Sequence, residues 1–224
     1  PICSGEGFTY NPADDPNNIV PIGTLYEWTV FADGPSTGYT DQGPNGVSPI
    51  SQTNLEVGNI PVTLTYTVTP YAPGTDGNRC PGDIFFINIQ VNPKPVIFDQ
   101  TAIICSGDDL VIPGAANAPP TIVPVATTYT WEIGSADSGI QNAISSSDLT
   151  GGPFTDMLIQ SGPNALVNDL DVVQFVTYIV TPISGDDGNC VGDPFEITVQ
   201  VDPEPTISSV TLDPICSGEG FTYN

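Results

Sequence analysis

Hydrophobic and polar residues alternate with a period of two in three stretches of the first half of the chain, and three related stretches recur in the second half. Such alternation is typical of strands that have one face in a core and one face toward solvent. The apolar positions of the first half are Tyr26, Trp28 and Val30, then Val62, Leu64, Tyr66 and Val68, then Phe85, Ile87, Ile89 and Val91. Those of the second half are Tyr129, Trp131 and Ile133, then Val176, Tyr178 and Val180, then Phe195, Ile197, Val199 and Val201. The pattern predicts an all-β chain made of two related halves.

Prolines and turn-forming residues bound these stretches. The second stretch of each half ends at Pro70 or Pro182, and proline cannot donate to the middle of a sheet. The third stretch leads into a joint with two prolines, at residues 92–95 and 202–205. About seven short strands in roughly a hundred residues indicate a β-sandwich of Ig-like topology, in which we expect the first strand to lie beside and parallel to the last.

Eleven residues at the start of the chain, 1–11, recur letter for letter at its end, 214–224. A looser copy lies between them, at residues 103–110. A repeat distance of 213 residues (214 minus 1) indicates an array of modules. The expected domains are residues 1–95 and 96–205, followed by residues 206–224 as a linker and the first strand of the next repeat.

Five cysteines follow the same repeat: Cys3, Cys80, Cys105, Cys190 and Cys216. Each half has one in its opening motif and one in a late Gly/Asp/Asn-rich turn, so pairing within each half predicts the disulfides Cys3–Cys80 and Cys105–Cys190. Each bond would close a loop of about 80 residues, worth roughly 4–5 kcal/mol in the chain-entropy model. Cys216 is expected to be unpaired because its repeat is truncated.

The alternative, a metal site, has neither a Cys-x-x-Cys pair nor a histidine to support it. Disulfides indicate an extracellular setting.

The chain is strongly acidic, with a formal net charge of −24 from 26 acidic and 2 basic residues. Such a surface repels nucleic acid and anionic membranes, because it offers almost nothing to neutralise phosphates. No apolar run approaches the ~18 residues of a membrane-spanning helix. We therefore expect no nucleic-acid partner and no membrane insertion.

Catalytic groups are scarce in this composition. The chain has no histidine, which excludes Ser-His-Asp and Cys-His arrangements. Neighbouring carboxylates occur at residues 14–15, 108–109 and 186–187, but the sequence gives no sign of a cleft in which two would converge as in a glycosidase. The prediction is that the protein is not an enzyme, with no catalytic residue and no cofactor.

Calcium is the one ion that the acidic turns around the late cysteines suggest, because it is held by carboxylate and carbonyl oxygens on loops. The alternative is that these residues only form solvated turns, and no EF-hand spacing is present. The candidate ligands are Asp76, Asp83, Asp186, Asp187 and Asp193, which Asp99, Asp108 and Asp109 could join at the interdomain joint.

The second half is longer between its Trp strand and its Tyr strand. The extra residues are expected in a surface loop at 145–163, which contains Phe154 and Met157 and so offers a contact surface or an ordinary loop. One tryptophan in each half, Trp28 and Trp131, is interpreted as a core residue, with a ligand platform as the alternative.

Several motifs together resemble the PKD-like and Ig-like repeat modules of very large surface proteins of gliding and marine Bacteroidota. They are the opening Cys-Ser-Gly, the Tyr-x-Trp strand, Tyr-x-Val-Thr-Pro, the Gly-Asn-Cys or Gly-Asn-x-Cys turn, and the exit Val-x-Pro-x-Pro. The resemblance covers nearly all of both halves. It implies two PKD-like sandwiches, secretion to the cell surface, and a role in adhesion or gliding motility, and it brings no catalytic residues.

The leading hypothesis is therefore a disulfide-stapled spacer in a long extracellular adhesin or filament, whose partners are neighbouring copies of the same repeat, head to tail. One alternative is a carbohydrate- or surface-binding module that acts through the inserted loop or exposed aromatic residues. Another is a subunit polymerised by donation of its terminal strand to an open sheet edge.

Overall fold

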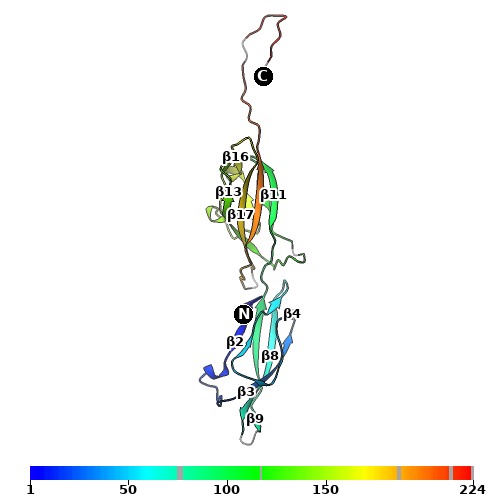
Figure 1. The fold of residues 1–224 in the computed structure, drawn as a ribbon, viewed down its shortest axis with the longest axis vertical. Helices are drawn as coiled ribbons and strands as arrows, with labels where there is room; N and C mark the ends of the chain where they lie inside the picture. Colours follow the sequence, from blue (N-terminus) through cyan, green and yellow to red (C-terminus); the bar gives the residue numbers. More distant parts are fainter. Residues whose placement is uncertain (75–77, 117, 186–187, 212–213, 223–224) are drawn as a thin grey trace.

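The computed structural model shows two β-modules in series along the long axis of the molecule, with the N-terminus close to the junction between them (Figure 1). Module 1 denotes residues 1–95 and module 2 residues 96–205. The structure describes residues 1–74, 78–116, 118–185, 188–211 and 214–222. Within these residues, no helix is long and apolar enough to cross a membrane.

Module 1 is a sandwich of one large sheet and two short strand pairs. The large sheet has the order β1-β10-β8-β3-β5, with β9 paired to one end of β8, and the short pairs are β2–β6 and β4–β7. The elements are β1 (Ile2–Cys3), β2 (Phe8–Tyr10), η1 (Pro12–Asp14), β3 (Leu25–Ala32), β4 (Ser36–Thr37), β5 (Gln42–Gly46), β6 (Ile50–Gln52), β7 (Glu56–Val57), β8 (Val62–Pro73), β9 (Arg79–Pro81) and β10 (Phe85–Asn92).

Module 2 repeats this plan with a sheet of order β11-β18-β17-β13 and the pairs β12–β15 and β14–β16. Its elements are β11 (Gln100–Cys105), β12 (Leu110–Ile112), β13 (Thr128–Ala136), β14 (Ile140–Gln141), η3 (Ser146–Asp148), β15 (Leu158–Gln160), η4 (Gly162–Asn164), β16 (Val167–Asn168), β17 (Gln174–Ile183) and β18 (Phe195–Asp202). The predicted all-β class with two sandwiches is confirmed.

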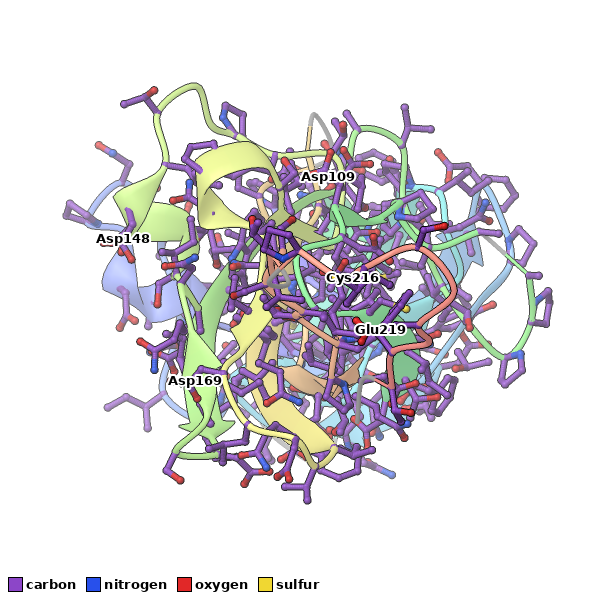
Figure 2. The ribbon with its side chains drawn as sticks, turned by 90° about the horizontal axis from the view of Figure 1, so that it is seen from above. Asp109, Asp148, Asp169, Cys216 and Glu219 are labelled. Carbon is purple, nitrogen blue, oxygen red and sulfur yellow. A yellow bond between two sulfur atoms is a disulfide. The ribbon has the colours of Figure 1, made fainter. Side chains whose placement is uncertain are left out.

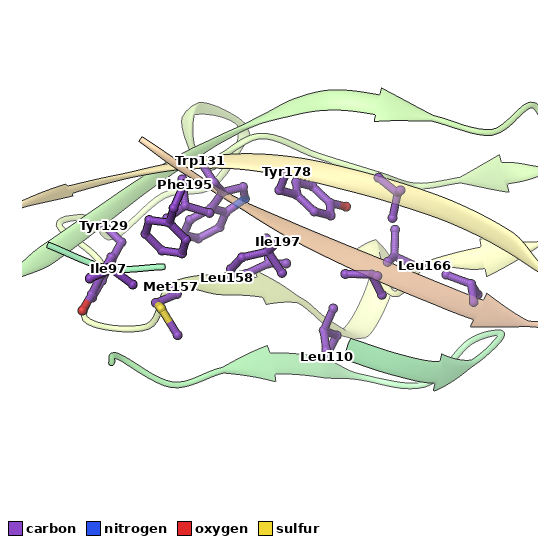
Figure 3. Close-up of a cluster of buried hydrophobic side chains, with 14 residues drawn as sticks. Ile97, Leu110, Tyr129, Trp131, Met157, Leu158, Leu166, Tyr178, Phe195 and Ile197 are labelled. Carbon is purple, nitrogen blue, oxygen red and sulfur yellow. The ribbon is translucent and has the colours of Figure 1, made fainter. Parts of the chain in front are cut away.

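The alternating side chains form one hydrophobic core in each module. In module 2 the apolar face of β13, β17 and β18 packs against Met157, Leu158 and Leu166 (Figure 3). Trp28 and Trp131 are 6% and 3% exposed, and each indole nitrogen donates a hydrogen bond to a backbone carbonyl. Both tryptophans are therefore core residues, as interpreted from the sequence.

The first strand of each module pairs with the last in parallel, as predicted. In module 1 the pairing is short, because β1 has two residues, whereas β11 has six. Phe85, Ile87 and Ile89 on β10 are only half-buried, while their counterparts on β18, which has the longer neighbouring strand β11, are buried.

The predicted surface loop at 145–163 is only partly a loop. Residues 158–160, toward its end, form β15, which pairs with β12, and Met157 is 5% exposed in the core. Phe154 packs against Trp131 with ring centroids 5.1 Å apart. The alternative of a contact surface is not supported for Met157, which is buried, and Phe154 is partly buried against the same core.

The junction between the modules as the candidate functional site

A disulfide joins Cys3 of module 1 to Cys190 of module 2, with Cα atoms 5.7 Å apart and a sequence separation of 187. Cys80, Cys105 and Cys216 are free and exposed. The predicted pairs Cys3–Cys80 and Cys105–Cys190 are therefore wrong. The bond links the two modules to each other rather than closing each one.

The register of the first and last strands explains the error. Cys3 is opposite Asn92, the last residue of β10, whereas Cys80 lies before Phe85, the first. Seven residues of strand at about 3.3 Å each separate these positions by roughly 23 Å. A disulfide needs Cα atoms within about 7 Å. Cys105 is likewise opposite Asp202, at the far end of β18 from Cys190.

The Cys-Ser-Gly motif holds Cys3 at the end of module 1 that faces module 2. The Ser4 amide donates to the Asn92 carbonyl (2.8 Å), and the Ser4 hydroxyl accepts from the Val57 amide (3.1 Å). The Cys3 amide donates to the Glu6 carboxylate (2.8 Å). Gly5 follows at φ +89°, a conformation that favours glycine. These contacts fix the direction in which the thiol leaves the sheet.

The turn that follows β17 in module 2 holds Cys190 on the module 2 side of the disulfide. The Cys190 amide donates to the Ser184 hydroxyl (2.8 Å), and the Ser184 amide donates back to the Cys190 carbonyl (3.0 Å). A further backbone bond, from the Gly192 amide to the Pro182 carbonyl (2.8 Å), closes the turn. Cys190 is 1% exposed.

Two glycines allow this turn to touch module 1. A Cβ on Gly192 would lie 2.6 Å from the backbone carbonyl oxygen of Pro95, so this position has no room for a side chain. A Cβ on Gly188 would lie 2.1 Å from Nδ2 of the Asn92 side chain, and the φ of Gly188, +103°, favours glycine.

An ion pair lies beside the disulfide. Lys94 Nζ is 2.7 Å from the Asp193 carboxylate, with the two side chains 31% and 87% exposed. Exposed pairs of this kind contribute only about 0–1 kcal/mol. The pair joins the two acidic modules across the junction, and Lys94 is one of only two cationic side chains in the sequence.

The calcium candidates do not come together among the described residues. Asp193 contacts Lys94, whereas Asp83 follows β9, which lies at the end of module 1 far from the junction (Figure 1). Within the described ranges no three acidic or cysteine side chains form a metal-binding group. Asp76, Asp186 and Asp187 lie outside the described residues, so calcium at the turns stays a prediction.

The other acidic residues named from the sequence stabilise local structure. The carboxylates of Asp99, Asp108 and Asp109 accept hydrogen bonds from the backbone amides of Glu196, Cys105 and Gly162, respectively. Figure 2 shows Asp109, Asp148 and Asp169 apart from one another, and Cys216 beside Glu219. The Cys216 amide donates to the Glu219 carboxylate (3.0 Å), which repeats the contact that Cys3 makes with Glu6.

Comparison with protein families gives one result for both modules. The model of the PKD-like domain matches residues 1–95 and again residues 102–205. No curated protein matches the chain.

Three solved structures show weaker similarity. Immunoglobulin domains 1–4 of Sidekick-1 have a TM-score of 0.25 at 11% identity, over 90% of this chain and 45% of that chain. The fibronectin(III)-like modules of Clostridium thermocellum CbhA have a TM-score of 0.23 at 9% identity, over 93% and 94%. Human protocadherin-24 EC1-2 has a TM-score of 0.26 at 9% identity, over 80% and 83%. The chain thus spans less than half the length of the Sidekick-1 structure.

Proposed function

The chain belongs to the PKD-like domain family, and on that premise we propose that it is a structural repeat of a long extracellular adhesin or surface filament, in which it serves as a disulfide-stapled spacer. The observation that carries the proposal is the Cys3–Cys190 bond between consecutive modules. A bond within each module would stabilise only that module, whereas a bond across the junction fixes the spacing and orientation of neighbours. That property is useful in a stalk.

The junction supports this role in three ways. The two-proline joint restricts bending of the chain that connects the modules, because proline fixes φ and limits the residue before it. The turn of module 2 packs on Asn92 and Pro95 without room for a Cβ. The disulfide adds a second covalent connection beside the joint. Two connections at one junction resist both bending and rotation.

The same bond supports an extracellular setting. Disulfides persist in oxidising compartments, which favours the outside of a cell. The net charge of −24 keeps neighbouring stalks apart and soluble. We propose cell-surface adhesion as the process, with gliding motility as its narrower form, and neighbouring copies of the repeat as the partners.

The stiffness of the spacer can be tested by comparing the oxidised chain with Cys3→Ser. Spin labels at Thr65 and Thr198, one on each large sheet, report the distance between modules by electron–electron resonance. The oxidised chain should give one narrow distance, and Cys3→Ser a broader distribution with both modules folded. Cys216→Ser is the matched control, because that thiol lies outside both modules. An equally broad distribution in the oxidised chain would contradict the spacer.

The location can be tested with antibodies raised against residues 1–205. Immunogold labelling of intact source cells should place the label on the outer surface, along extended structures. Label confined to the cytoplasm would contradict the proposal whatever the stiffness of the isolated chain.

A further inference from the structure

We propose that Cys105 of one 213-residue unit forms a disulfide with Cys80 of the next unit, so that every junction in the array is covalently closed. The inference rests on the proposed function in one respect, that units follow one another head to tail. It assigns a partner to two cysteines that are free and exposed in this chain.

Cys105 lies at the C-terminal end of the large sheet of module 2, as Cys3 lies at the corresponding end of module 1, where the chain leaves the module. The Ser106 amide donates to the Asp202 carbonyl (2.9 Å), and the Ser106 hydroxyl accepts from the Asn168 amide (3.0 Å). Ser4 makes the same two contacts with Asn92 and Val57. The thiol of Cys105 therefore leaves the sheet at the position from which Cys3 reaches its partner.

Cys80 occupies the same position in module 1 as Cys190 in module 2. Cys80 is opposite Ala72 in the β8–β9 pair, and the Gly82 amide donates to the Pro70 carbonyl (2.8 Å). In module 2, Cys190 is opposite Ser184, and Gly192 makes the matching bond to Pro182. The two late cysteines differ in exposure because a module covers only one of them: Cys190 is buried under module 1.

The chain continues past module 2 as it does past module 1. Val96, just after the first joint, forms a β-bridge with Ile122, and the next residue, Ile97, is 7% exposed in the core. Past the second joint, Ile207 is 83% exposed, and Ile19, the module 1 residue that corresponds to Ile122, is 94% exposed. If the next module 1 is built as module 2 is, the residue after the second joint would bridge Ile19 as Val96 bridges Ile122, and Ile207 would enter the core as Ile97 does.

The ion pair of the first junction is not repeated at the second. Glu204 stands in the second joint where Lys94 stands in the first, and Asp83 in the late turn of module 1 stands where Asp193 stands in module 2, so both positions are acidic. The cation of this turn is Arg79, directly before Cys80, and in the proposed junction it pairs with Glu204. In this chain Arg79 bonds within module 1, to the Pro44 carbonyl and the Asn45 side chain.

The bond forms by oxidation of two thiols. Each sulfur loses its proton, one Sγ–Sγ bond forms, and the two electrons reduce a disulfide oxidant, such as oxidised glutathione, to two thiols. Both cysteines are exposed and available for this exchange.

Closed junctions would give the array two parallel covalent paths. One runs from Cys190 along β18 to Cys216, over 26 residues, and crosses to the Cys190 of the next unit. The other runs from Cys80 along β10 and β11 to Cys105, over 25 residues, and crosses to the next Cys80. Tension would then pass through the first and last strands of each module, which pair in parallel, and would bypass the rest of the sandwich.

The test is a two-unit chain, residues 1–213 followed by residues 1–224, oxidised with glutathione and digested without reduction. Mass spectrometry should find Cys3–Cys190 in the first unit and Cys105 of the first unit bonded to Cys80 of the second. Cys105 that stays free, or bonds elsewhere, while Cys3–Cys190 forms would overturn the inference and leave the proposed spacer standing. Absence of both bonds would overturn the inference and contradict the spacer as well.

A charge exchange tests the docking geometry separately. Arg79→Glu in the second unit should slow formation of the Cys105–Cys80 bond by about two- to fivefold, the range of an exposed ion pair. Adding Glu204→Arg in the first unit should restore the rate. The Cys3–Cys190 bond should form at an unchanged rate in both variants. Equal rates of Cys105–Cys80 formation in all three chains would count against the proposed contact.

Discussion

Cys3 and Asn92 are register partners at the end of the parallel pair formed by β1 and β10. Asn92 is also where the last strand ends and the joint to module 2 begins. The Cys3 thiol is therefore beside the exit of its own module, within reach of the late turn of the following one, and Cys190 Sγ lies 3.9 Å from the Asn92 carbonyl oxygen. The position of one cysteine along a strand decides whether its bond closes a module or joins two.

The bond predicts how the chain responds to force applied at its two ends. While it is intact, tension passes from residues 1–3 directly to residues 190–224, and the 187-residue loop between the cysteines carries none. The fully extended oxidised chain should reach about 130 Å, because 38 residues lie on the path. Reduction should release a further 620–670 Å or so. Single-molecule pulling, with and without reductant, measures both lengths.

Cys190→Ser is the decisive variant for this prediction, because it should show the long extension without reductant. Cys80→Ser should behave as the unmodified chain, since Cys80 is free in one unit. A long extension of the oxidised chain would mean that the cysteines are not bonded.

The buried tyrosines predict two opposite effects of removing a hydroxyl. The hydroxyls of Tyr66 and Tyr178 are buried and have no hydrogen-bond partner within the described ranges. Tyr66→Phe and Tyr178→Phe should therefore leave the free energy of unfolding unchanged or raise it by up to about 1 kcal/mol, because an unpaired buried polar group is costly. Urea unfolding of each variant measures the change.

Tyr129→Phe is the matched control. Its hydroxyl accepts a hydrogen bond from the Ala115 amide (3.1 Å) at the edge of the same kind of core. Loss of this acceptor should lower the stability of module 2 by about 1 kcal/mol. If all three variants lost the same stability, the assigned difference in hydrogen bonding would be wrong.

The sheets could be predicted from the sequence because their pattern is local. Alternation at Tyr26, Trp28 and Val30 identifies a strand and its buried face from a few neighbouring residues. Prolines at the strand ends and glycines in the turns set the lengths. The sandwich and its parallel first and last strands follow from the number of such segments.

The disulfide could not be predicted in the same way because it depends on register and on the neighbouring module. In module 1 the first strand has only two residues, so from the sequence Cys3 is interpreted as its first residue. In module 2 the strand is longer: β11 begins at Gln100 and ends at Cys105, which places the opening cysteine at the end of the strand, next to the exit from the module. The core role of Met157 was missed for a related reason: β15 is recognised by its pairing with β12, far away in sequence.

Burial of Tyr66 and Tyr178 also predicts that the free energy of unfolding falls at alkaline pH. Desolvation raises the pKa of Tyr66 and Tyr178 well above the ordinary value of 10. Below pH 10 both hydroxyls are protonated in the folded and unfolded states, so stability does not depend on them. Above pH 10 the unfolded chain releases these protons and the folded chain keeps them, so stability falls by up to about 1.4 kcal/mol per pH unit and per tyrosine.

This prediction is checked by urea unfolding between pH 8 and pH 11.5, after the free thiols have been alkylated. The double variant Tyr66→Phe and Tyr178→Phe should lose most of the pH dependence above pH 10. An identical decline in the double variant would assign the effect to other groups.

The uncovered edge of β10 predicts that module 1 gains stability from a longer first strand. An open groove of about 620 Å³ lies there, and its lining includes Ile19, Val20 and Phe85. In module 2 the equivalent space is filled by Ile97, next to Phe195 in the core (Figure 3). When residues 206–213 are placed before Pro1, Ile207 should take this position, and burial of an isoleucine contributes about 1.5–3 kcal/mol. Urea unfolding should show module 1 stabilised by that amount, with slower hydrogen exchange in β10. The same segment with Ile207→Asp is the control, and an equal gain from it would show that length rather than the buried side chain stabilises the module.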